Sequence, residues 1–193
     1  MVNIKMGIVY KNFECIETCF EGLYIIKNQI YKDERGYFEE TFHKTAYMAM
    51  KLPYNFVQDN YSVSRKGVIR GLHFQIKKPQ GKLLRVVEGE IFDVAVDLRK
   101  SSATFGKWFG ICIKAGEGIQ VWIPEGFAHG FQVLSDYAKV AYKCTDMYDP
   151  SDEGGVRWND TQIDIKWKML DVPNFVSEKD ENLPLFQNTY YFK

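Results

Sequence analysis

Four of the basic side chains in residues 68–85, V-I-R-G-L-H-F-Q-I-K-K-P-Q-G-K-L-L-R, are candidates for chemistry. They are Arg70, His73, Lys82 and Arg85. Histidine is the side chain best suited to move a proton near neutral pH. A histidine beside fixed positive charge can take a proton from carbon and stabilise the enolate that forms. His73 is one of three histidines in the chain and is therefore the first candidate for acid–base catalysis.

A metal site is the competing interpretation of His73. Residues 118–129, G-I-Q-V-W-I-P-E-G-F-A-H, resemble the second motif of the cupin superfamily, which ends here in His129. Cupins usually bind metal through a His-x-His pair and a glutamate of the first motif. Here Gln75 replaces the second histidine, no glutamate follows at the usual distance, and the neighbouring cations oppose a divalent ion. We expect no metal and no other cofactor, with a metal-dependent cupin such as a dioxygenase as an alternative.

Short β-prone segments separated by turn signals dominate the middle of the chain. Strands are expected over Asn60–Ser64, Val68–Phe74, Leu83–Val87, Ile91–Asp97, Trp108–Lys114, Gln120–Ile123, Phe131–Leu134 and Val140–Cys144. This spacing predicts an all-β sandwich or barrel and favours a double-sheet jelly roll, and the resemblance at residues 118–129 makes that jelly roll cupin-type. Short peripheral helices are expected, one of them over Lys44–Lys51. Arg70 and His73 then face opposite sides of one strand unless the chain bends at Gly71.

The 193 residues are expected to form a single domain large enough to bury a core. Residues 1–13 have no clear periodicity and are expected to be an N-terminal extension, with Met6 as an alternative start. Residues 168–193 carry prolines and mixed charge and are expected to wrap over the barrel. The segment Ser177–Asp180 can reach a site on the strands only if the tail wraps in this way.

Composition limits the classes of partner. The chain has 25 basic and 25 acidic residues and no net charge, so neither nucleic acid nor a membrane surface is an expected partner. The four cysteines are scattered and do not complete a zinc site. No signal-peptide pattern or membrane-length apolar run is present in the sequence, which favours a reduced, cytoplasmic protein.

Nine motifs, in the same order, resemble the dTDP-4-dehydrorhamnose 3,5-epimerase family of the cupin superfamily. They are D-E-R-G-Y-F-E-E at 33–40, F-V-Q-D-N at 56–60, R-G-L-H-F-Q at 70–75, Q-G-K-L-L-R at 80–85, G-E-I-F-D-V-A-V-D-L-R at 89–99, T-F-G-K-W at 104–108, I-P-E-G-F-A-H-G-F at 123–131, W-N-D at 158–160 and S-E-K-D at 177–180. Because several spaced motifs match together, the resemblance is far more specific than the cupin turn alone.

The resemblance implies a cofactor-independent epimerase with a homodimeric assembly that pairs sheets and exchanges N-terminal strand residues. His73 is implied as the base, held by Asp180, and Tyr142 as the acid that returns a proton to the opposite face. Lys82 is implied to stabilise the enolate at the C4 oxygen. The implied substrate-binding residues are Arg35, Glu40, Gln58, Asn60, Arg70, His129, Glu153 and Lys179.

The implied substrate is a dTDP-4-keto-6-deoxyhexose, whose 4-keto group acidifies the hydrogens at C3 and C5. The expected reaction inverts both carbons of dTDP-4-dehydro-6-deoxy-D-glucose and gives dTDP-4-dehydro-L-rhamnose, in rhamnose-type sugar biosynthesis. Family members often have Tyr-Tyr-x-Pro where this chain has Met147-Tyr148-Asp149-Pro150. A single-carbon epimerase on a related sugar is therefore an open alternative, and a non-catalytic sugar-nucleotide sensor on the same barrel is another.

Overall fold

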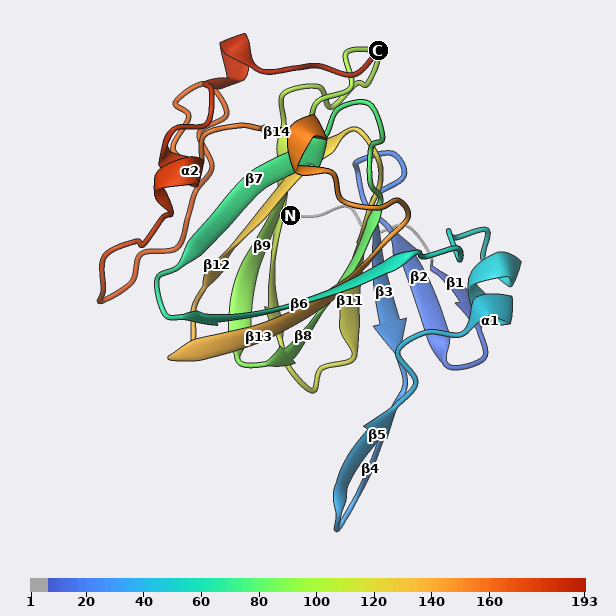
Figure 1. Ribbon diagram of the computed structural model, residues 1–193. Helices are drawn as coiled ribbons and strands as arrows, with labels where there is room; N and C mark the ends of the chain where they lie inside the picture. The colour runs from blue at the N-terminus through green and yellow to red at the C-terminus, as the bar shows by residue number, and fades with distance from the viewer. Residues whose placement is uncertain (1–6) are drawn as a thin grey trace.

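Two antiparallel β-sheets pack face to face in the computed structural model, which describes residues 7–193 (Figure 1). The larger sheet has the strand order β1-β2-β3-β11-β8-β13-β6. In that order its strands are Ile8–Tyr10, Phe13–Glu17, Tyr24–Asn28, Ile119–Ile123, Lys82–Glu88, Tyr137–Cys144 and Gln58–Arg65. The smaller sheet has the order β10-β9-β12-β7-β14. Its strands are Trp108–Lys114, Glu90–Asp97, Phe127–Val133, Ile69–Gln75 and Glu153–Gly155. The predicted all-β, double-sheet architecture is confirmed.

All eight strands expected from the sequence are present as β6 to β13. The largest differences are at the starts of β12 and β13, which begin four and three residues earlier than expected, at Phe127 and Tyr137. The sequence did not predict β1 to β5 or β14. Strand β14, Glu153–Gly155, has two glycines and little β propensity, and it forms because β7 offers an edge to pair with.

Apolar side chains fill three layers. The first lies between the two sheets and includes Leu84, Ala95 and Val121. The second lies between the outer face of the smaller sheet and the C-terminal segment, where Phe186 packs. The third lies between the larger sheet and a helix that contributes Tyr47. Strands covered on both faces lose the polar alternation of a half-exposed sheet, so β9 and β12 are buried along nearly their whole length.

The helices are short and peripheral, as predicted. Helix α1 spans Lys44–Ala49 and ends two residues before the expected position. Helix α2 spans Glu178–Glu181, and 3-10 turns occupy Pro150–Asp152 and Phe186–Asn188. Among residues 7–193, no helix is long and apolar enough to cross a membrane.

A β-hairpin made of β4, Ile30–Asp33, and β5, Gly36–Glu39, projects away from the two packed sheets (Figure 1). Its aromatic side chains remain exposed, with Phe38 at 68% and Tyr37 at 51%. Within residues 7–193 the hairpin is held by hydrogen bonds from Tyr31 to Asn12 and from Asn28 to Glu39, and these two rings stay largely uncovered. The hairpin thus presents exposed aromatic surface in the single chain.

The chain ends have defined contacts. Of the expected N-terminal extension, residues 1–6 lie outside the described residues, whereas β1 and the start of β2 belong to the larger sheet. In the tail, Phe175 pairs with Val68 and Phe192 pairs with Arg99. The tail therefore runs along the smaller sheet, and it carries α2 against β7.

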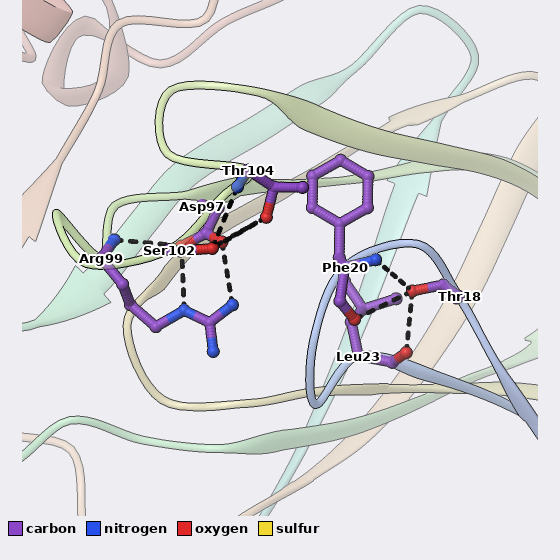
Figure 2. Close-up of polar contacts among 7 residues, drawn as sticks. All are labelled: Thr18, Phe20, Leu23, Asp97, Arg99, Ser102 and Thr104. Atoms are coloured by element: carbon purple, nitrogen blue, oxygen red, sulfur yellow. Dashed lines mark hydrogen bonds and ion pairs between the residues drawn. The ribbon is translucent and has the colours of Figure 1, made fainter.

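A buried carboxylate organises the connection between β9 and β10 (Figure 2). Asp97 is fully buried and accepts hydrogen bonds from the guanidinium and backbone of Arg99. Its second oxygen also accepts from the hydroxyls of Ser102 and Thr104. In the neighbouring turn, the Thr18 hydroxyl bonds to the carbonyls of Phe20 and Leu23. These contacts fix the loops at one end of the two sheets.

Candidate active site

Strand β7 carries an irregularity that brings Arg70 and His73 to one side. His73 pairs with His129, and Arg70 pairs with Phe131, so two residues of β7, Gly71 and Leu72, lie opposite the single residue Gly130 of β12. This extra residue is a β-bulge, which reverses the facing of the side chains that follow it. Arg70 and His73 accordingly line one cavity, and the condition stated for Gly71 is met.

The bulge requires glycine at position 71. Gly71 has φ +111°, and a Cβ there would lie 2.6 Å from the His129 carbonyl oxygen. Only glycine adopts this backbone conformation readily at such close approach. The Gly71 N–H then points at the Asp180 carboxylate, with 3.0 Å between nitrogen and Oδ2. The turn in β7 thus also supplies a hydrogen bond to the site.

His73 is held by a carboxylate from the tail. Its Nε2 lies 2.9 Å from Oδ1 of Asp180, which is 4% exposed. Asp180 sits in α2, whose N-cap Ser177 accepts the Asp180 N–H. Burial raises the pKa of Asp180, but hydrogen bonds from His73 and Gly71 outweigh it and lower the pKa overall. Asp180 therefore stays ionised and can orient the imidazole and stabilise its protonated form.

Glu153 is a second carboxylate beside His73. Its Oε1 lies 3.6 Å from the His73 Nε2, and its Oε2 accepts from Lys179 Nζ at 2.6 Å. The Tyr148 hydroxyl donates to the same oxygen. Burial raises the pKa of Glu153, and the bonds from Lys179 and Tyr148 bring it below its usual range. Glu153 is thus an anion that links β14, the tail and the loop that carries Tyr148.

Lys82 and Tyr142 face His73 from the opposite sheet. Lys82 opens β8 and Tyr142 lies in β13, whereas His73 belongs to the smaller sheet. The Lys82 ammonium reaches across to the His73 carbonyl oxygen at 3.4 Å. Burial lowers the pKa of Lys82, although nearby Cys144, Glu153 and Asp93 oppose that shift. Burial likewise raises the pKa of Tyr142, so its phenol keeps its proton at neutral pH.

Two adjoining cavities, of about 610 and 780 Å³, share His73, Lys82 and Tyr142. The first cavity is lined by Gln58, Asn60, His73, Phe74, Gln75, Gln80, Lys82, Tyr142, Tyr148 and Glu153. The second is lined by Ser62, Arg70, His73, Lys82, His129, Gly130, Phe131, Tyr142, Ser177, Lys179 and Asp180. The fold thus brings ten of the twelve sequence-predicted site residues to one place.

His129 forms a second histidine–carboxylate pair. Its Nε2 lies 2.7 Å from Oδ1 of Asp93, and both side chains are buried. The other carboxylate oxygen of Asp93 is buried and has no hydrogen-bond partner within residues 7–193. In the same part of the chain, no group of three or more His, Cys, Asp or Glu is placed to hold a metal ion. His129 and His73 thus each have a carboxylate partner.

Arg35 and Glu40 do not reach the cavities of this chain. Arg35 lies at the turn of the projecting hairpin, where its side chain is 85% exposed and pairs with Asp33. Glu40 accepts a hydrogen bond from Asn12, at the base of the same hairpin. Within one chain, these two sequence-predicted residues therefore stay apart from the other ten.

Several cavity residues were not chosen from the sequence, among them Tyr148, Gln75 and Gln80. Gln75 and Gln80 lie inside motifs that match the family, and Gln75 was interpreted only as the residue that replaces the second histidine of a metal-binding cupin motif. Tyr148 follows Met147, the residue at which the chain departs from Tyr-Tyr-x-Pro. Asp93 was also missed, although a signal existed. A carboxylate inside the apolar run E-I-F-D-V-A-V-D of β9 has to find a buried partner, and His129 on the neighbouring strand provides it.

Comparison with known proteins identifies the family. A sequence profile described as dTDP-4-dehydrorhamnose 3,5-epimerase matches residues 17–188. A protein of that name from Methanothermobacter thermautotrophicus is 51% identical over 181 residues, which are 93% of this chain and 98% of the relative. The chain belongs to the dTDP-4-dehydrorhamnose 3,5-epimerase family. The resemblance found from the motifs is therefore confirmed.

Solved structures of this family share the fold. A dTDP-6-deoxy-D-glucose-3,5-epimerase from Legionella pneumophila, in complex with dTDP-4-keto-L-rhamnose, superimposes with a TM-score of 0.87 and 46% identity, covering 91% of this chain and 94% of that one. A 3'-monoepimerase from Streptomyces bikiniensis, in complex with dTDP-quinovose, has a TM-score of 0.81 and 32% identity, covering 86% and 85%. The family fold thus includes enzymes named for two carbons and for one.

Proposed function

We propose that this chain is a cofactor-independent, single-domain epimerase. It inverts C3 and C5 of dTDP-4-dehydro-6-deoxy-D-glucose and gives dTDP-4-dehydro-L-rhamnose, for rhamnose-type sugar biosynthesis. The observation that carries the proposal is the placement of His73 and Tyr142 on opposite sheets, around one cavity. Inversion at carbon requires a base on one face of the sugar and an acid on the other, and this arrangement supplies both.

The reaction begins when His73 removes the proton from one carbon next to the 4-keto group. The electrons of the carbon–hydrogen bond become an enolate whose negative charge collects on O4. Lys82 offsets that charge, and the anion in turn compensates the burial that disfavours the Lys82 ammonium. Tyr142 then gives its phenolic proton to the opposite face of the carbon. Solvent returns a proton to Tyr142 and accepts one from His73 before the second carbon reacts.

Asp180 acts on His73 and not on the substrate. With Nε2 of His73 committed to Asp180, the other ring nitrogen, Nδ1, has no hydrogen-bond partner among residues 7–193. A fixed tautomer of this kind leaves one lone pair to accept the proton from carbon. The ionised Asp180 also stabilises the imidazolium that results. His73 is therefore the base, and Asp180 its positioning residue.

The remaining polar residues bind the nucleotide sugar. Arg70, His129 and Lys179 line the cavity of about 780 Å³ and meet the anionic part of the ligand, because charge-assisted hydrogen bonds to phosphate are strong. Gln58, Asn60 and Glu153 line the adjoining cavity and offer hydrogen-bonding groups to the neutral part. Arg35 and Glu40 complete the site from a partner subunit.

We infer a homodimer, which two surfaces exposed in the single chain support. Tyr61, at 59% exposure, and Val63, at 54%, lie on the outer face of the edge strand β6. A groove of about 660 Å³ on that face includes Tyr61, Arg85 and Lys143. We assign this face to the β4–β5 hairpin of a second copy, because the exposed aromatic side chains of the hairpin match the apolar surface of the face. The exposed Arg35 at the hairpin turn then contributes to the site.

Inversion of both carbons is favoured over inversion of one. Met147, where the chain departs from the family pattern, is 58% exposed, whereas its neighbour Tyr148 lines the cavity. The departure therefore changes a side chain that faces solvent. The relative named for both carbons is also more similar to this chain than the 3'-monoepimerase is.

Turnover of dTDP-4-keto-6-deoxyglucose in D2O, followed by NMR of the product, tests the proposal. We expect deuterium at both C3 and C5, both with inverted configuration. His73→Ala should give no label, and Tyr142→Phe should retain exchange but lose inversion. Label at one carbon would identify a single-carbon epimerase. Binding of dTDP without any label would identify a sensor, and loss of turnover after exhaustive chelation would indicate the metal-dependent alternative.

A further inference from the structure

The loop that joins β13 to β14, residues 145–152, forms one wall of the cavity through Tyr148. Three glutamine side chains from outside the loop hold its main chain. Gln58 Oε1 accepts the Tyr148 N–H at 2.8 Å, and Gln75 Oε1 accepts the Asp149 N–H at 2.8 Å. Gln80 Nε2 donates to the Asp146 carbonyl at 2.7 Å. The position of Tyr148 thus depends on side chains of β6, β7 and the β7–β8 connection.

Gln75 is the most constrained of the three. It is 2% exposed, ends β7 two residues after His73, and lies opposite Glu153 in the pairing of β7 with β14. In a metal-binding cupin motif, the same position supplies the second histidine of His-x-His. Here the side chain holds a loop through an acceptor that a methionine or leucine of similar size lacks. Gln75 therefore links the strand of the proposed base to the wall opposite it.

We propose, on the basis of the function proposed above, that Gln75 is a positioning residue that sets affinity for the nucleotide sugar by holding Tyr148 against the cavity. The Asp149 backbone lies in an exposed part of the loop. Without its acceptor, the Asp149 N–H can turn to water, so the loop is displaced while the core stays packed. The effect falls on binding and leaves the His73–Asp180 pair and Tyr142 in place.

Steady-state kinetics of Gln75→Met test this directly, because methionine has nearly the same shape without the amide oxygen. We expect KM to rise about two- to tenfold, the range given by loss of one hydrogen bond, with kcat and its pH profile unchanged. Gln75→Glu keeps an acceptor at the same place and is the matched control, with KM closer to that of the native enzyme. Gln75→Leu replaces Gln75→Met if the latter does not fold.

A double-mutant cycle separates positioning from general stability. If Gln75 acts through Tyr148, Gln75→Met should change KM less than about twofold in a Tyr148→Ala background. Hydrogen exchange of the 145–149 amides should accelerate in Gln75→Met and remain native-like in Gln75→Glu. An equal rise of KM in both backgrounds, or a fall in kcat at unchanged KM, would overturn the assignment.

The hydrogen-exchange measurement needs no substrate. It reports whether Gln75 holds the loop even if the native protein fails to turn over dTDP-4-keto-6-deoxyglucose. Failure of native turnover would therefore remove the proposed function, whereas unchanged exchange in Gln75→Met would remove the role of Gln75 alone. Faster exchange with an unchanged KM would show that the loop moves without setting affinity, and would also overturn the proposal.

Discussion

The proposed chemistry of His73 depends on a carboxylate that comes 107 positions later in the chain. Asp180 remains ionised because His73 and the Gly71 amide donate hydrogen bonds to its carboxylate, against the burial that opposes its charge. An ionised partner fixes which imidazole nitrogen carries the proton. At the scale of single residues, the orientation and tautomer of the base are therefore set by the tail as much as by β7.

Replacing Asp180 with asparagine should lower kcat about 10²- to 10⁴-fold, because the amide can favour the wrong tautomer and cannot stabilise an imidazolium. KM should change little, since the Asp180 carboxylate contacts His73 and not the substrate. Ser177→Ala is the matched control, because it removes the N-cap hydroxyl and leaves the carboxylate. It should lower kcat far less. Comparable losses in kcat for the two variants would mean that α2 placement, and not the Asp180 charge, is what His73 needs.

Strand β7 and the β4–β5 hairpin differ in how well their structure could be predicted from the sequence. Strand β7 was predicted from its β-prone residues, and Gly71 marked where it could bend. The hairpin of β4 and β5 was matched to the family motif D-E-R-G-Y-F-E-E, but its strands were not predicted. Within residues 7–193 its aromatic side chains Tyr37 and Phe38 stay exposed, so its strands lack the buried face that makes a strand recognisable in the sequence.

Mixing two inactive variants tests which subunit the hairpin serves. Arg35→Ala and His73→Ala should each lose activity as homodimers. Co-expressed, they should form mixed dimers in which one site has both an intact His73 and the partner's intact Arg35. Random assembly should then restore about a quarter of native activity. No recovery in purified mixed dimers would show that Arg35 does not act across the interface.

For the whole molecule, the sequence predicted the central strands because two buried sheets require continuous apolar, β-branched segments. It did not predict β14, which depends on pairing with β7. It also did not predict that Arg35 lies away from the site of its own chain. The site residues were found through motifs and not through physical periodicity. Asp93 and Asp97 show why periodicity was not enough. Both lie among apolar residues of β9 and both are buried, but their partners, His129 and Ser102, are brought to them only by the tertiary structure.

Asp97 gives a prediction for the stability of the whole fold. Asp97→Asn removes one charge and an acceptor from the cluster in Figure 2 and leaves the half-buried Arg99 without its ion pair. Unfolding free energy should fall by about 3 kcal/mol, and Tm by roughly 5–10 °C. The exposed pair Lys66–Asp171 supplies the control, since Asp171→Asn should leave Tm nearly unchanged.

The difference in Tm between the native protein and Asp97→Asn should depend on pH, and the direction of that dependence follows from the pKa of Asp97. Burial raises the pKa of Asp97, but bonds from Arg99, Ser102 and Thr104 lower it below the ordinary value. A carboxylate with a lowered folded-state pKa contributes stability that is complete above the unfolded pKa, about 3.9, and is lost as the pH falls through the folded-state pKa. The Tm gap between native protein and Asp97→Asn should therefore be constant from pH 8 to about pH 5 and narrow below about pH 4. A gap that persists unchanged at pH 3 in thermal melts would show that shape, and not the charge of Asp97, holds the β9–β10 connection.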